Sequence, residues 1–200
     1  TPLYDDKGKK LLHLGLGYSY VSLKDSLGMV RFHSLPEVHL ASSYVDTGNF
    51  VANSYNLFGF EAAAVFNSLS VQGEYMFADV DSAASGDPTL HGYYVEASYY
   101  LTGENRNYKE GAFGRTKVRK NFLKNDGLGA WQLALRYSSI DLNDAGVTGG
   151  EENNITVGLN WHLNNNTRVM FNYVNTDIEG GAGQDFGNLE VFQARFQVVF

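Results

Sequence analysis

The amino-acid sequence predicts an all-β fold, a transmembrane antiparallel up-and-down β-barrel, and two observations favour it. In the stretch 190–200, every second residue from Phe192 to Phe200 is apolar, and most residues between them are polar. A period of two is that of a strand with one apolar and one polar face. At a rise of ~3.3 Å and a tilt near 45°, about eleven residues span a bilayer core. The second observation is that no apolar run approaches the ~18 residues of a transmembrane helix.

Similar alternation recurs along the chain and predicts about nine strands. The segments lie at about 11–23, 29–44, 55–66, 69–77, 91–101, 130–142, 154–163, 168–173 and 190–200. The segment 29–44 is the weakest, because Pro36 lies inside it and cannot donate to a ladder, which suggests a bulge or a break. An odd number of strands does not close a bacterial single-chain barrel. If the Pro36 segment is not a strand, the alternative is a small eight-stranded barrel.

The connections between these segments differ in length. The links 24–28, 67–68 and 164–166 are short, and the links 45–54, 81–90, 143–153 and 178–189 are longer. Short periplasmic turns that alternate with longer outer loops are typical of outer-membrane barrels. If the C-terminus is periplasmic, counting back along the chain predicts that every short link lies at that end.

The link 102–129 breaks this pattern, because a short turn is expected there and a long one is present. Long loops inside compact folds are often functional. Its basic residues are Arg106, Lys109, Arg115, Lys117, Arg119, Lys120 and Lys124, nearly half of the 15 in the chain. We predict that this basic link folds toward the barrel lumen and places positive charge there. The alternative is a solvated basic loop that faces the periplasm.

Composition excludes several functions. The net charge of −7 gives no support to nucleic-acid binding. Cysteine is absent, so no disulfide or thiol chemistry is expected. The five histidines match neither a metal-binding spacing nor a Ser/His pattern. We therefore expect no metal, no cofactor and no enzyme activity, and treat residues 1–200 as part of one barrel domain.

Several segments resemble the phosphate-selective porin O and P family. They are Leu12–Gly15, Arg31–Leu40, Gln72–Met76, Gly92–Glu104, Gly111–Arg115, Gly129–Tyr137 and the closing strand that ends in phenylalanine. The similarity is to the C-terminal half of that family. It implies a sixteen-stranded, trimeric porin in the outer membrane of a Gram-negative bacterium, with about seven further strands before Thr1. It also implies outer-membrane lipid and lipopolysaccharide as neighbours.

The resemblance implies a passive diffusion channel for small anions, namely phosphate or polyphosphate. The lumen of this channel is expected to be lined by Arg and Lys side chains. The anion-binding candidates are Arg115, Lys117, Arg119, Lys120, Arg136, Arg168 and Arg195. For the strand arginines the alternative is pairing with Glu61, Glu74 and Glu96, which would make them struts in the wall. A weakly selective general porin and a structural outer-membrane barrel are the alternative functions.

Overall fold

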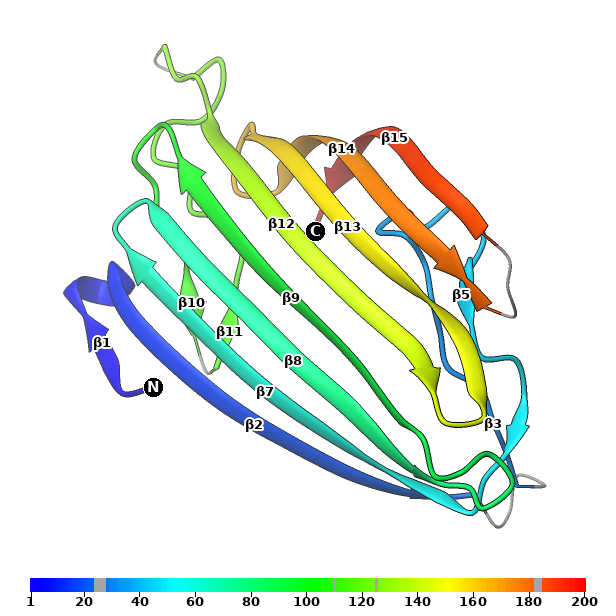
Figure 1. The fold of residues 1–200 in the computed structure, drawn as a ribbon. Coiled ribbons are helices and arrows are strands. Elements are labelled where there is room, and N and C mark those ends of the chain that lie inside the picture. Colours follow the sequence, from blue (N-terminus) through cyan, green and yellow to red (C-terminus); the bar gives the residue numbers. More distant parts are fainter. Residues whose placement is uncertain (24–27, 110, 125, 182–184) are drawn as a thin grey trace.

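The computed structural model describes residues 1–23, 28–109, 111–124, 126–181 and 185–200, and its long strands form one antiparallel sheet (Figure 1). The order in the sheet is β1-β2-β7-β8-β9-β12-β13-β14-β15. Their bounds are β1 Leu3–Asp5, β2 Lys10–Ser22, β7 Ser54–Phe66, β8 Leu69–Asp81, β9 Thr89–Tyr100, β12 Ala130–Asp144, β13 Val147–His162, β14 Thr167–Gly180 and β15 Asp185–Val198. The predicted all-β, antiparallel architecture is confirmed.

The strands separate apolar and polar side chains onto opposite faces of the sheet. On the outer face, Leu16 is 83% exposed and Phe192 is 71% exposed. On the other face, Gln72 pairs in register with Glu96, which pairs with Arg136, which pairs with Thr156. No described segment of the chain covers the apolar face of the sheet. An apolar surface of this size requires an apolar environment, such as a lipid bilayer.

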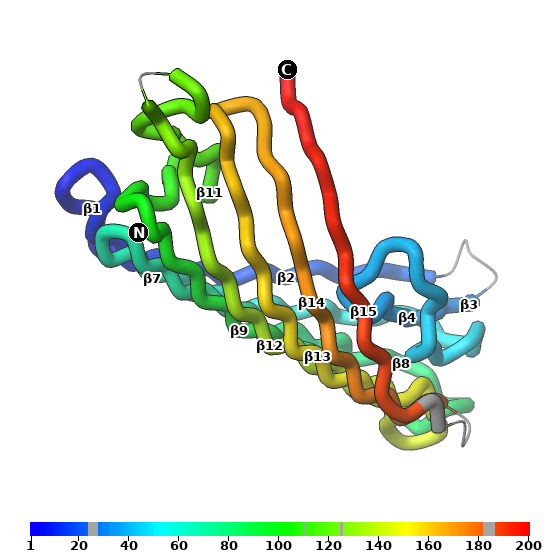
Figure 2. The backbone as a smooth tube through the Cα atoms, turned by 90° about the horizontal axis from the view of Figure 1, so that it is seen from above, coloured from blue at the N-terminus to red at the C-terminus, as the bar shows by residue number. Residues whose placement is uncertain are grey.

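The eight long strands have 12 to 16 residues, which is enough to cross a bilayer core at a tilt. Seen from above, β12–β15 rise at an angle from the layer of β2–β9, so that the sheet is bent around its polar face (Figure 2). The sheet is open, with β1 at one edge and β15 at the other. Among the described residues, no helix is long and apolar enough to cross a membrane.

The prediction of a strand over 29–44 is wrong. Strand β2 pairs directly with β7, from Lys10 opposite Phe66 to Ser22 opposite Ser54. The intervening chain forms only the short pairs β3 Met29–Val30 with β6 Phe50–Val51 and β4 His33–Ser34 with β5 Val45–Asp46. Pro36 has no N–H for a ladder, and the residues beside it pair locally instead. The ninth strand of the sheet is β1, which is followed by the short 3₁₀ turn η1 (Asp6–Gly8).

This correction also changes the assignment of one short link. Leu23 N–H donates to Asn53 O, so the chain leaves β2 and returns to β7 at the same end of the sheet. That end is opposite the turn 67–68, which joins the other ends of β7 and β8. Residues 24–27 lie outside the described part of the chain. The residues that flank them lie at the end of the sheet opposite the turn 67–68, so the prediction that both short links share one end is wrong.

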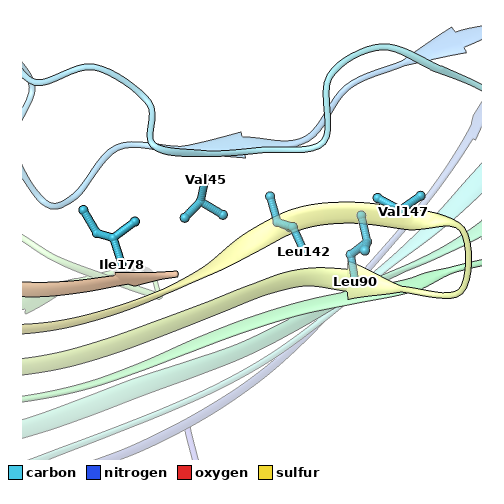
Figure 3. Close-up of a cluster of buried hydrophobic side chains, with 5 residues drawn as sticks. All are labelled: Val45, Leu90, Leu142, Val147 and Ile178. Carbon is cyan, nitrogen blue, oxygen red and sulfur yellow. The ribbon is translucent and has the colours of Figure 1, made fainter. Parts of the chain in front are cut away.

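The chain from 28 to 53, here called the inward segment, lies against the polar face of the sheet. Val45, which has no exposed surface, packs with Leu90, Leu142, Val147 and Ile178 (Figure 3). Strand β5 contacts both β13 and β14. Burial of these apolar side chains makes the main favourable contribution to the free energy that holds the inward segment on the polar face of the sheet.

An ion pair within the inward segment should make its stability depend on pH. Arg31 Nε donates to Asp46 Oδ1 at 2.8 Å, and a second bond joins the same two side chains. This bonding lowers the pKa of Asp46 from 3.8 to about 2. The stabilisation is therefore complete above pH ~4 and is lost as the pH falls toward 2.

We expect Asp46→Asn to reduce hydrogen-exchange protection of the Thr47 amide, which donates to Phe32 O, at pH 7. The difference from the parent protein should shrink as the pH falls from about 4 to about 2. The measurement is the protection factor at several pH values. A difference that stays constant down to pH 2 would contradict the assignment.

Candidate functional site

The basic link begins and ends at the same end of the strands as the turn 163–166 and the C-terminus. Phe122 N–H donates to Leu163 O at 2.8 Å, and Val199 N–H donates to Asn166 O at 2.9 Å. Val118 N–H donates to Asn165 Oδ1 at 2.9 Å. The bonds of Phe122 and Val118 attach the second half of the link to the turn between β13 and β14, and the bond of Val199 attaches the C-terminal residues to the same turn.

The first half of the link lies over the polar face of the sheet. It contains the short hairpin of β10 Tyr108–Lys109 and β11 Ala112–Phe113, which Figure 1 shows beside β7 and β8. Arg106 Nη1 donates to Gln72 Oε1 at 2.8 Å, and the Tyr108 hydroxyl lies 2.7 Å from His13 Nδ1. The link therefore binds to side chains of β8 and β2 as well as to the strands that it connects.

Aromatic side chains of the link pack against the sheet and against one another. The Tyr108 and Phe113 rings lie 5.6 Å apart, and the Arg106 guanidinium lies 3.9 Å above the Phe113 ring. Phe122 meets Trp161 edge to face at 4.6 Å. Such contacts fix the path of the link on the sheet.

A cavity of about 590 Å³ lies between the basic link and the strands β9, β12, β13, β14 and β15. Among the described residues, three arginines line it, Arg106, Arg115 and Arg168, together with one carboxylate, Glu96. Amide side chains of Gln132, Asn160 and Asn164 to Asn166 complete much of the lining. The cavity therefore combines an excess of positive charge with amide groups that can donate hydrogen bonds.

Two of the predicted anion-binding residues meet in this cavity. Arg115 comes from the link, and Arg168 comes from β14. Arg168 Nε donates to Gln197 Oε1 at 2.9 Å, which holds the guanidinium against β15. Arg195 lies on the same face of β15, diagonally across the ladder from Arg168, since Arg168 pairs with Gln197. No carboxylate of the described residues forms an ion pair with these three arginines.

The remaining predicted residues lie elsewhere. Lys117, Arg119 and Lys120 are exposed on the link and do not line the cavity. The Arg119 guanidinium lies against Gly103, where an added Cβ would come within 3.0 Å of its Nη1. Arg136 is paired with acids: its Nη1 lies 3.3 Å from Glu96 Oε2, which was the alternative expected for strand arginines.

Sequence reasoning missed two residues of this face. Arg106 was counted among the basic residues of the link, but a non-periodic segment gives no indication of which side chains face the wall. Glu37 lies in the segment that was wrongly predicted to be a strand, and its Oε1 accepts from Arg136 Nε at 2.8 Å. In the part of the chain that the structure describes, no group of three His, Cys, Asp or Glu residues could hold a metal ion.

Comparison with known proteins agrees with this architecture. The family model described as phosphate-selective porin O and P matches residues 1–200. An "Uncharacterized protein" of Caulobacter vibrioides is 33% identical over 175 residues, which cover 86% of this chain and 35% of that protein. Porin O of Pseudomonas aeruginosa is 30% identical over 225 residues, which cover 95% of this chain and 49% of that protein.

The chain thus spans about half, or less, of the length of the curated relatives that it matches. The match over the full chain confirms the resemblance seen in the sequence motifs. The chain belongs to the phosphate-selective porin O and P family, whose members are porins of the outer membrane of Gram-negative bacteria, and are channels rather than enzymes.

Proposed function

We propose that the chain forms part of the wall of an outer-membrane channel through which small anions, phosphate among them, diffuse passively. The polar face of the sheet is then the lumen wall, and the apolar face contacts lipid. The observation that carries the proposal is the cavity lined by Arg106, Arg115 and Arg168, where positive charge exceeds negative charge.

Arginine suits this role for a physical reason. A permeating ion loses part of its hydration shell at a constriction, and wall groups must replace it without trapping the ion. The guanidinium is always charged, and its planar fork offers two parallel donors to the oxygens of a phosphate. Arg115 and Arg168 line the same cavity, so an anion could contact both and pass from one to the other.

The complete channel in this proposal is a sixteen-stranded barrel that assembles as a homotrimer, with the inward segment and the basic link both in the lumen. Half of such a barrel would leave two open sheet edges, which is the state of β1 and β15 here. Lipid and lipopolysaccharide surround the apolar face. Leu14, Leu133 and Val157 are among the exposed apolar side chains that would meet them.

A weakly selective general porin is the second candidate, and the acids of the polar face favour it. Glu61 and Glu74 lie directly opposite each other on β7 and β8. Glu61 Oε1 lies 3.0 Å from His13 Nε2, and Glu74 accepts from the Tyr94 hydroxyl at 2.7 Å. Neither acid has an arginine or lysine partner among the described residues, so both could attract cations.

The reversal potential of the intact porin in a planar bilayer under a KCl gradient separates the two candidates. The anion channel predicts a reversal potential near the chloride equilibrium potential, and a chloride current that added phosphate reduces. A reversal potential near zero with no effect of phosphate would favour the general porin. Cation selectivity would overturn the proposed anion channel.

A further inference from the structure

A chain of ion pairs connects the inward segment and the basic link through the same part of the wall. Arg136 Nε donates to Glu37 Oε1 at 2.8 Å, and Arg136 Nη1 lies 3.3 Å from Glu96 Oε2. Glu96 Oε1 in turn lies 3.2 Å from Arg106 Nη1. The order is acid, base, acid, base, with Glu37 from the inward segment at one end and Arg106 from the basic link at the other.

We propose that Glu37 determines how strongly the channel selects anions, because its carboxylate cancels the charge of Arg136. This inference rests on the proposed function. Two arginines and two carboxylates sum to zero, so this level of the wall adds no net charge to the lumen. The positive potential then arises from Arg115 and Arg168, which line the same cavity as Glu96 and Arg106.

The structure holds Glu37 in place from several directions. Its backbone has φ of 53°, a left-handed conformation that non-glycine residues adopt where their surroundings enforce it. Pro36 and Val38 on either side are buried. The Ser138 hydroxyl also donates to Glu37 Oε1 at 2.8 Å, and Gln193 Nε2 donates to Glu37 O at 3.2 Å.

Arg136 has supports that do not depend on Glu37. Its guanidinium lies 3.7 Å above the Tyr94 ring and keeps its ion pair with Glu96. The side chains of Arg136 and Glu37 are 28% and 27% exposed, so both act on an ion in the adjacent solvent. Removal of the Glu37 charge should therefore leave Arg136 in position and add one net positive charge to the wall.

The test is Glu37→Gln in the intact porin, with reversal potentials measured under a KCl gradient. We expect the ratio of chloride to potassium permeability to rise roughly six-fold, because one unit charge about 8 Å from an ion in water favours the anion and disfavours the cation by about 0.5 kcal/mol each. The double variant Glu37→Gln with Arg136→Gln has the net charge of the parent protein and should restore the parent ratio.

Ser138→Ala is the matched control, because it removes a hydrogen bond to the same oxygen without changing any charge. An equal shift in Ser138→Ala would show that displacement of the inward segment, and not charge, sets the ratio, and would overturn the inference. So would an unchanged ratio in Glu37→Gln. The reversal potential of the parent protein tests the proposed function separately, since the inference concerns the difference between variant and parent.

Discussion

Arg168→Glu should shift the permeability of the intact porin away from chloride and toward potassium. Arg168 lines the cavity and, among the described residues, has no acidic partner, so its whole charge acts on the ion path. A unit charge about 8 Å from an ion in water changes its energy by about 0.5 kcal/mol. The reversal changes the charge by two units and acts with opposite sign on chloride and potassium, so we expect the ratio of chloride to potassium permeability to fall roughly 30-fold.

The control for this variant is Lys124→Glu, which makes the same change of charge at an exposed position of the basic link that does not line the cavity. We expect its reversal potential to stay close to that of the parent protein. Arg168→Gln, which keeps a side chain able to bond with Gln197, should give an intermediate ratio. Equal shifts in the Arg168 and Lys124 variants would mean that total charge, and not the cavity, sets selectivity.

Val45→Asp should release the inward segment from the wall. Val45 has no exposed surface and packs with Leu142 and Ile178, so the aspartate would be buried without a partner. An ionised carboxylate without a partner in such a site costs several kcal/mol, in addition to the apolar contacts that Val45 loses. We expect single-channel conductance to rise, because the segment no longer occupies the polar face, and protease cleavage to appear between residues 28 and 53.

Val51→Asp makes the same chemical change on the same segment at a side chain that is 55% exposed. It should leave both conductance and protease resistance close to those of the parent protein. Folding of Val45→Asp can be verified by retention of β-sheet circular dichroism. Parent-like conductance and resistance in a folded Val45→Asp protein would show that the cluster around Val45 does not hold the inward segment.

The long strands could be predicted from the sequence because the alternation of apolar and polar residues in each strand reflects the lipid on one face and water on the other. A strand between lipid and water must alternate, so the pattern of β13 or β15 identifies the strand, its two faces and the antiparallel arrangement. The motifs around Gly92–Glu104 and Gly129–Tyr137 were enough to indicate the family, which the match over residues 1–200 confirms.

The weaker predictions failed where local pattern competes with tertiary contacts. The alternation over 29–44 was weak, and Pro36 was a sign that the segment would leave the sheet, yet sequence gave no reason to pair His33 with Asp46. That pairing depends on the packing of Val45 against strands about 45 to 130 residues away. Such contacts have no periodic signature.

By itself the sequence determined the eight long strands, their apolar and polar faces, and the family. Only the tertiary structure decided which arginines remain uncompensated. Arg136 and Arg168 both face the polar side and are alike in the sequence, but Glu37 and Glu96 pair with Arg136 while Gln197 bonds with Arg168. The physical reason is that charge compensation depends on distances of a few ångström between residues far apart in the chain, which periodicity does not encode.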